Sequence, residues 1–169
     1  MLNNALEKIS SNLHQSGYQT QINPSIPGVM ARLYAYSPSA FGLGFAKVED
    51  HFIFIDWENP ACQRLDLLLE TYLSFSKFVN TGFPIPHALR IRIPNLVICL
   101  LSFIGFTAEI NDFSQNTYLT PWYGGETGQL ILLDLKNKIT IHHKTPKFRS
   151  QGSLPLQHAV DVISKLFSN

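Results

Sequence analysis

The chain has 169 residues, of which 45% are hydrophobic and only 15% are charged, against about 25% charged residues in an average globular protein. This composition excludes an intrinsically disordered chain, and the length fits one domain over residues 1–169 that can bury a sizeable core. The net charge of +1 argues against attraction of the whole surface to nucleic acid.

The N-terminal third predicts one helix and two strands. Apolar residues recur at helical spacing from residue 2 to residue 13, and Gly17 ends the pattern as a glycine after a helix does. Strands are predicted at 18–22 and 29–36, and Ser37-Pro38-Ser39 is expected to end the second of them.

A hairpin and a long helix are predicted next. Two apolar runs, 43–48 and 51–57, flank Glu49-Asp50 and predict a β-hairpin with an acidic two-residue tip. Asn59-Pro60 has the residues of a helix start, with an N-cap followed by a first-turn proline, and Gly82 is expected to end this helix. Its buried face is predicted to contain Leu65, Leu68, Leu69, Tyr72, Phe75 and Val79.

The run from Asn95 to Phe106 is the longest uncharged apolar stretch of the chain. It is shorter than the roughly 18 residues of a bilayer-spanning helix, and its valine, isoleucine and preceding Pro94 favour a strand. Because this strand would be apolar on both faces, we expect it in the centre of a sheet that helices cover on both sides. An alternating strand at 88–93 is predicted before Pro94.

The last third predicts a short helix at 107–115, a loop at 116–128, a hairpin formed by 129–135 and 138–144, and a final helix beginning at Ser153. Helices and strands therefore alternate in groups along the chain. This order predicts a single domain of the α/β (α+β) class, in which helices pack on a mixed sheet.

The N-terminus and the cysteines predict a cytoplasmic protein. Residues 1–4 lack a basic region followed by an apolar one, so we expect neither a signal peptide nor a membrane segment. Cys62 and Cys99 lie in apolar surroundings, and their spacing fits no zinc pattern. We expect both thiols to be reduced and buried.

Asp134-Leu135-Lys136 is an acid-x-lysine pattern on a predicted strand, and the acidic Glu126 precedes it. In metal-dependent nucleases two acids hold Mg²⁺ or Mn²⁺, and a lysine stabilises charge on the attacked phosphate. Alternate residues of a strand share a face, so Asp134 and Lys136 could point together. The alternative is that they are the charged end of a hairpin strand.

The predicted order of helix, three strands, long helix and further strands resembles the restriction-endonuclease-like, PD-(D/E)xK, family up to about residue 101. The resemblance implies acids on the second and third strands, where this chain has Asp56-Trp57-Glu58, with Glu58 in place of the lysine. The Asp134-x-Lys136 pattern follows the long helix instead. The resemblance therefore implies a related, degenerate core with a lost or rearranged site.

Asp56 and Glu58 also close a predicted buried strand, and ligands of open α/β sheets bind beyond the carboxyl ends of strands. The alternative is that Asp56 meets a basic side chain or caps the following helix. Arg90 and Arg92 share one face of a predicted strand and could bind an anion between them. The alternative is that they form ion pairs with buried acids such as Asp56.

The stretch from residue 136 to residue 149 is basic and contains no acid. It could bind phosphates of a nucleic acid, or it could be a solvated hairpin and loop. Besides Lys136, its candidate nucleic-acid-binding residues are Lys138, Lys144, Lys147 and Arg149.

The first functional hypothesis is a non-enzymatic protein without a cofactor that associates with itself or with another protein. It depends on the low charge, on the incomplete catalytic patterns and on aromatic residues in predicted loops, namely Phe41, Phe83, Trp122 and Tyr123. The alternative is a metal-dependent nuclease or its remnant. In that case Mg²⁺ or Mn²⁺ would be bound by acids among Asp56, Glu58, Glu126 and Asp134, with Lys136 beside them.

Overall fold

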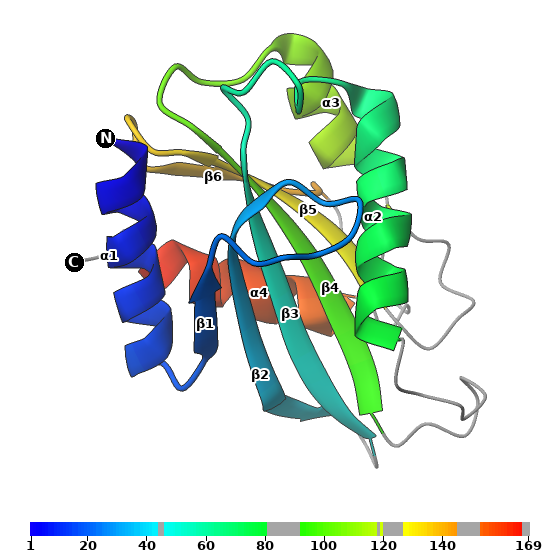
Figure 1. Ribbon diagram of the computed structural model, residues 1–169. Coiled ribbons are helices and arrows are strands. Elements are labelled where there is room, and N and C mark those ends of the chain that lie inside the picture. The colour runs from blue at the N-terminus through cyan, green and yellow to red at the C-terminus, as the bar shows by residue number, and fades with distance from the viewer. Residues whose placement is uncertain (44–45, 81–91, 118, 120–126, 145–152, 167–169) are drawn as a thin grey trace.

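Within the described part of the chain, six strands form one mixed sheet and four helices pack on it (Figure 1). The computed structural model describes residues 1–43, 46–80, 92–117, 119, 127–144 and 153–166. The elements are α1 (Leu2–Gln15), β1 (Gln19–Ile22), β2 (Ala31–Leu43), β3 (Ala46–Asp56), α2 (Leu65–Asn80), β4 (Arg92–Ser102), α3 (Ala108–Asn116), β5 (Thr127–Asp134), β6 (Ile139–Ile141) and α4 (Ser153–Lys165). The predicted fold class is confirmed.

The strands lie in the sheet in chain order, from β1 at one edge to β6 at the other. β1, β2 and β3 form an antiparallel meander, β3, β4 and β5 run parallel, and β6 returns antiparallel beside β5. Parallel neighbours need crossover connections, which α2 and α3 supply. The carboxyl ends of β3, β4 and β5 therefore lie side by side at the same end of the sheet.

β4 is the predicted central strand, and its side chains enter two separate cores. Leu96, Ile98 and Leu100 pack in the core that includes α2 and α3, whereas Val97, Cys99 and Leu101 pack in the core that includes α1 and α4. All six side chains are fully buried. Full burial of such a side chain stabilises a fold by roughly 1.5–3 kcal/mol, so both helical layers depend on this strand.

The end of α1 places Tyr18 in the interior. Gly17 has φ +87°, and its N–H donates to the carbonyl of His14 at 3.0 Å, while the N–H of Tyr18 donates to the carbonyl of Leu13 at 3.0 Å. This pair of bonds is a Schellman motif, which favours glycine because of the positive φ. The predicted stop at Gly17 is confirmed, and the turn leaves Tyr18 only 5% exposed.

Two predictions about β2 and β3 are wrong because both strands are longer than expected. β2 continues through Ser37-Pro38-Ser39, where the pairing shifts register between Ser37 and Phe41 and so accommodates the proline. β3 runs straight through Glu49-Asp50, and the pairing of the two strands extends to Leu43 and Ala46. Glu49-Asp50 is therefore not a hairpin tip, and it lacks the glycine or asparagine that a two-residue turn favours.

β4 also begins earlier than predicted. Pro94 lies inside the strand, opposite Glu49, rather than separating two strands. A proline close to the start of a strand removes one N–H where the ladder is just beginning, so it is tolerated there. The remaining residues of the predicted 88–93 strand, 88–91, lie outside the described residues.

α2 begins at Leu65 rather than at Asn59-Pro60. The Asn59 side chain instead accepts a hydrogen bond from the N–H of Ala61 at 3.1 Å and forms a turn. Leu69, predicted on the buried face, is 46% exposed. No helix in the described ranges has the length and apolar character that a membrane crossing requires.

Candidate functional site

Asp134, the acid of the Asp-x-Lys pattern, closes the turn between β5 and β6. Its carboxylate accepts hydrogen bonds from the N–H of Lys136 at 3.1 Å, from the N–H of Asn137 at 2.9 Å and from Asn137 Nδ2 at 2.8 Å. Burial raises the pKa of this carboxyl, but the bonds from Asn137 and Lys136 outweigh burial and hold the pKa below its ordinary value. The geometry matches the structural alternative, with the Lys136 side chain exposed to solvent.

Asp56 and Glu58 bind backbone groups as well. Asp56 Oδ1 accepts a hydrogen bond from the N–H of Glu58 at 3.1 Å. Glu58 Oε1 accepts one from the N–H of Phe103 and lies 3.4 Å from the hydroxyl of Ser102. Asp56 therefore stabilises the turn after β3, and Glu58 connects this turn to the turn after β4.

The sheet register brings Asp56, Glu58 and Asp134 to the carboxyl ends of the parallel strands. Asp56 lies opposite Leu101, and Ser102 lies opposite Asp134, so Asp56 and Asp134 end the strands β3 and β5, while β4, which lies between them, ends at Ser102. In the described residues, no three His, Cys, Asp or Glu side chains are grouped as metal ligands. Glu126 lies outside those residues.

A hollow of about 600 Å³ lies at the carboxyl ends of the parallel strands, between the turn after β3 and the turn after β4. Its lining includes Trp57 and Ser102. Arg64 pairs with Asp66 at the start of α2, and both side chains are exposed. The hollow has the position at which open α/β sheets bind ligands. Arg64 is the cationic side chain in its described lining, and Arg64 is already paired with Asp66.

Of the predicted basic residues that the structure describes, Arg92 and Lys138 lie at opposite ends of the sheet. Arg92 lies at the amino end of β4, whereas Lys138 follows β5 at the opposite end of the sheet and Lys144 follows β6. Lys138 adopts a positive φ of 56° in the β5–β6 turn, and Lys144 donates its N–H to the carbonyl of Gln115 at 3.1 Å. The other candidates, Arg90, Lys147 and Arg149, lie outside the described residues.

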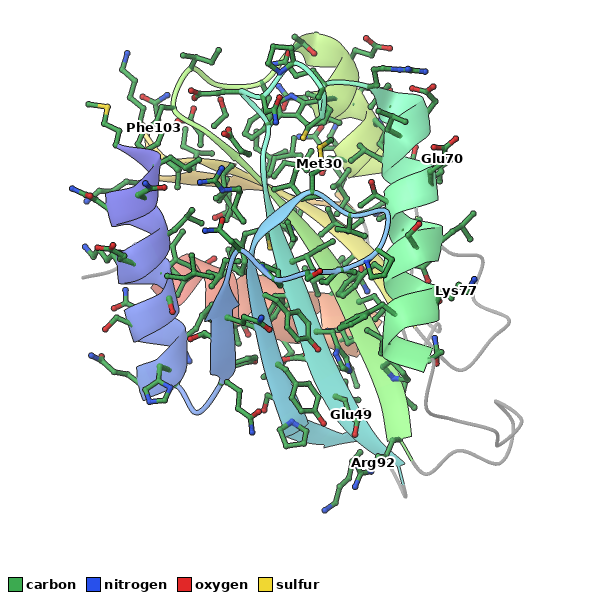
Figure 2. The ribbon with its side chains drawn as sticks, in the orientation of Figure 1. Met30, Glu49, Glu70, Lys77, Arg92 and Phe103 are labelled. Atoms are coloured by element: carbon green, nitrogen blue, oxygen red, sulfur yellow. The ribbon has the colours of Figure 1, made fainter. Side chains whose placement is uncertain are left out.

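Arg92 forms an ion pair with a buried acid, but this acid is Glu49 rather than Asp56. Arg92 Nη1 lies 2.7 Å from Glu49 Oε1, and Glu49 is only 2% exposed (Figure 2). His51 and Arg92 hold the pKa of Glu49 below its ordinary value, against burial, which raises it. His51 Nε2 lies 3.8 Å from Glu49 Oε2, too far for a hydrogen bond, so Arg92 is the bonded partner.

Aromatic side chains surround His51 on the same face of the sheet. His51 Nδ1 lies 2.8 Å from the hydroxyl of Tyr34, and the Tyr36 ring centroid is 4.8 Å from that of the imidazole. Burial raises the pKa of Tyr34 beyond its ordinary range, and the charge of Glu49 adds to the effect. Tyr34 is therefore a protonated hydrogen-bonding group at neutral pH rather than a phenolate.

Asp50 points to the other face of β3 and is fully buried. Its Oδ2 accepts a hydrogen bond from the Tyr18 hydroxyl at 2.6 Å and lies 3.0 Å from His158 Nε2, while its Oδ1 accepts one from Asn95 Nδ2 at 2.8 Å. Asn95 Nδ2 also lies 3.3 Å from the carbonyl of Pro155. We call Tyr18, Asp50, Asn95 and His158 the Asp50 cluster. It joins the α1–β1 turn, β3, β4 and α4 through one carboxylate.

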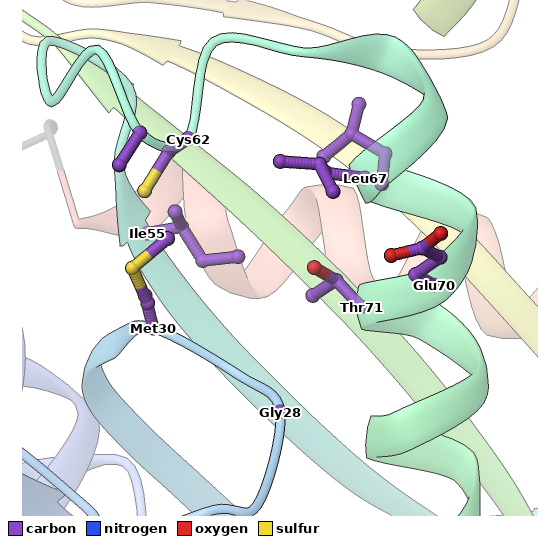
Figure 3. Close-up of a pocket in the computed structure, with 9 residues that line it drawn as sticks. Gly28, Met30, Ile55, Cys62, Leu67, Glu70 and Thr71 are labelled. Atoms are coloured by element: carbon purple, nitrogen blue, oxygen red, sulfur yellow. The ribbon is translucent and has the colours of Figure 1, made fainter.

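Both cysteines are free and buried, as predicted. Cys62 lines a small, mainly apolar cavity of about 90 Å³ between α2 and the loop that holds Gly28 and Met30 (Figure 3). Burial raises the pKa of the Cys62 thiol, and the Asp56 charge raises it further, while burial alone raises that of Cys99. A raised pKa leaves a thiol protonated and a poor nucleophile, and the cavity is below the ~300 Å³ of ordinary ligand pockets.

The sequence reasoning missed the buried charges of β3 because it interpreted Glu49-Asp50 as a turn. The available signal was the absence of glycine, asparagine and proline from the stretch Ala46 to Asp56, because a two-residue hairpin turn favours glycine and asparagine. Charged residues inside such a strand must find partners when they are buried. Perturbed and buried charges of this kind are enriched at functional sites.

Comparisons with protein-family models, with curated proteins and with solved structures each found no match to this chain. The resemblance to the restriction-endonuclease-like family therefore stays a prediction, and function must be argued from the geometry alone.

Proposed function

We propose that the protein acts by association, and that it pairs with a second copy of itself through the outer side of α2. The observation that carries the proposal is a pair of leucines one helical turn apart, Leu69 and Leu73, which are 46% and 65% exposed. Single exposed leucines are ordinary, but residues four apart on a helix are neighbours on its surface, so these two leucines together present one apolar area. The inner side of the same helix buries Leu68, Tyr72 and Phe75.

The charges of α2 favour a second copy as the partner. Glu70 lies in the first half of the helix, and Lys77 lies in its last turn (Figure 2). In an antiparallel, two-fold pairing centred on Leu73, Glu70 of each chain approaches Lys77 of its partner. The lysine stem then covers Leu69 of the other chain, which buries apolar area while the ammonium group stays at the rim.

The state of the predicted catalytic acids also supports association over catalysis. Asp134 and Asp56 accept hydrogen bonds from backbone N–H groups of their own turns, and Glu58 accepts one from the N–H of Phe103. Carboxylates used in this way are positioned by the turns that they stabilise. The nuclease alternative needs some of the same oxygens for a metal ion.

The test is sedimentation velocity or gel filtration with light scattering over a wide concentration range. The wild-type chain is expected to reach twice the monomer mass, and Leu73→Glu is expected to be monomeric, because two like charges would face each other across the two-fold axis at a cost of several kcal/mol. Leu154→Glu is the matched control, since Leu154 is 55% exposed on α4, far from α2 in the chain.

A charge exchange identifies the pairing more closely. Lys77→Glu is expected to weaken the dimer, and the double variant Glu70→Lys with Lys77→Glu is expected to restore it. A wild-type chain that stays monomeric at every concentration would refute the proposal. A dimer that Leu154→Glu disrupts as strongly as Leu73→Glu does would move the interface away from α2.

A further inference from the structure

Two members of the Asp50 cluster, Tyr18 and His158, line a hollow on the opposite face of the sheet from α2. Tyr18 and His158, which both contact Asp50, line this hollow together with the end of α1, β2 and α4. Its volume is about 390 Å³, which falls in the range of small-molecule pockets. The described residues that line it are Ser16, Gly17, Tyr18, Ser37, Ala40, His158, Val162 and Lys165.

Among the described lining residues, Lys165 carries the permanent charge, which is positive. The described part of the lining also contains the imidazole of His158 and contains no carboxylate, and Asp50, which contacts His158, is fully buried. His158, Val162 and Lys165 are spaced i, i+4 and i+7 on α4, so they follow one stripe of the helix. Ser37 adds a hydroxyl from β2, directly opposite Asp50 in the register.

The buried carboxylate of Asp50 contacts two side chains that line this hollow, Tyr18 and His158. Asp50 holds three polar groups from three different elements at 2.6–3.0 Å, and His158 remains 28% exposed beside it. A buried carboxylate that contacts an imidazole restricts the orientation of the ring. Apolar residues would give comparable stability, so orientation of His158 is a reason for a charge at this place.

We propose that this hollow is a binding site for a small anion, a carboxylate or a phosphate, held by Lys165, His158 and the Ser37 hydroxyl, with Asp50 as the positioning residue for His158. The ammonium group supplies the attraction, and the imidazole and hydroxyl fix the orientation. The site is independent of the proposed pairing through α2, because α4 and α2 pack in different cores.

The test is a titration of the ¹⁵N-labelled protein with inorganic phosphate and, separately, with succinate, each at constant ionic strength, observing the histidine ring signals by NMR. We expect saturable shifts of the His158 signals with at least one anion, while exposed His14 is unaffected. Lys165→Gln is expected to weaken binding about tenfold, the effect of losing one charged contact. Lys8→Gln removes the same charge from α1 and is expected to leave the affinity unchanged.

The two anions distinguish the ligand class. Saturation with phosphate alone assigns a phosphate site, saturation with succinate alone assigns a carboxylate site, and saturation with both assigns a general anion site. Shifts that do not saturate with either anion overturn the proposal. So does an equal loss of affinity in Lys165→Gln and Lys8→Gln, because the attraction would then be a general effect of surface charge.

Discussion

Removal of the Tyr18 hydroxyl tests whether the Asp50 cluster is as closely bonded as its distances indicate. In Tyr18→Phe the ring keeps its packing against Phe52, where the ring centroids are 5.5 Å apart, and only the 2.6 Å hydrogen bond to Asp50 is lost. Asp50 is fully buried, so the substitution leaves its carboxylate with one protein hydrogen bond fewer. A hydrogen bond to a charged group contributes roughly 1.5–3 kcal/mol, so we expect the free energy of unfolding to fall by about 2 kcal/mol.

Urea unfolding at neutral pH, followed by circular dichroism, measures this loss as a lower midpoint at an unchanged slope. The thermal midpoint should fall by roughly 4–8 °C, since each kcal/mol shifts a domain of this size by about 2–4 °C. Tyr36→Phe on the neighbouring strand is the control, because its ring contact with His51 survives the substitution; it should stay within about 0.5 kcal/mol of wild type. An equal effect of the two substitutions would refute a bonded, buried Asp50.

Three further substitutions or titrations test other parts of the structure. Asp134→Ala should lower the free energy of unfolding by about 1 kcal/mol in urea at neutral pH, because it removes the acceptor for the Asn137 and Lys136 N–H groups. Because the folded pKa of Asp134 is lowered, its contribution is complete above the unfolded pKa and is lost as pH falls through the folded value, so the variant should lose less stability than wild type on acidification. Gly28→Ala should be destabilised by about 1 kcal/mol or more in the same assay, since φ is +74° and a Cβ would lie 2.8 Å from Ser74 Oγ. Calorimetric titration with Mn²⁺ or Mg²⁺ should give no saturable heat; one site per chain that is lost in both Asp134→Ala and Asp56→Ala would favour the nuclease alternative.

The parts of the fold that were predictable from sequence depend on local patterns. The apolar run of β4 specified a central strand, because a strand that is apolar on both faces must be covered on both faces. Gly17 marked the end of α1 because the Schellman turn requires a positive φ. In contrast, Asn59-Pro60 resembles a helix start but forms a separate turn before Leu65, since the same residue types also favour turns.

The parts that were not predictable depend on partners distant in the chain. Asp50 is satisfied by Tyr18 and Asn95, which lie 32 and 45 residues away, and Glu49 is satisfied by Arg92, which lies 43 residues away. No local pattern indicates that such partners exist. Two adjacent acids without visible partners were therefore interpreted as a solvated turn, although each is buried on its own face of β3.

The buried polar groups of the Asp50 cluster can contribute either to the stability of the fold or to anion binding. One set of variants distinguishes these two roles. Asp50→Leu alone should cost about 1–3 kcal/mol for each buried donor that loses its acceptor, because it removes the acceptor of the Tyr18 hydroxyl and the carboxylate beside His158. The triple variant Tyr18→Phe, Asp50→Leu and His158→Leu removes all three groups, and Asn95 keeps the Pro155 carbonyl. Replacement of both partners of a buried polar contact by apolar groups of similar shape can be nearly neutral or stabilising.

We therefore expect the triple variant to be at least as stable as wild type in urea unfolding but to lose anion binding. The phosphate and succinate titrations, now followed through the backbone amide signals around Lys165, measure that loss. A triple variant several kcal/mol less stable than wild type would show that the charges contribute to stability in their own right. A stable variant that binds anions as wild type does would leave Lys165 and Ser37 as the site and remove any role for Asp50 in positioning.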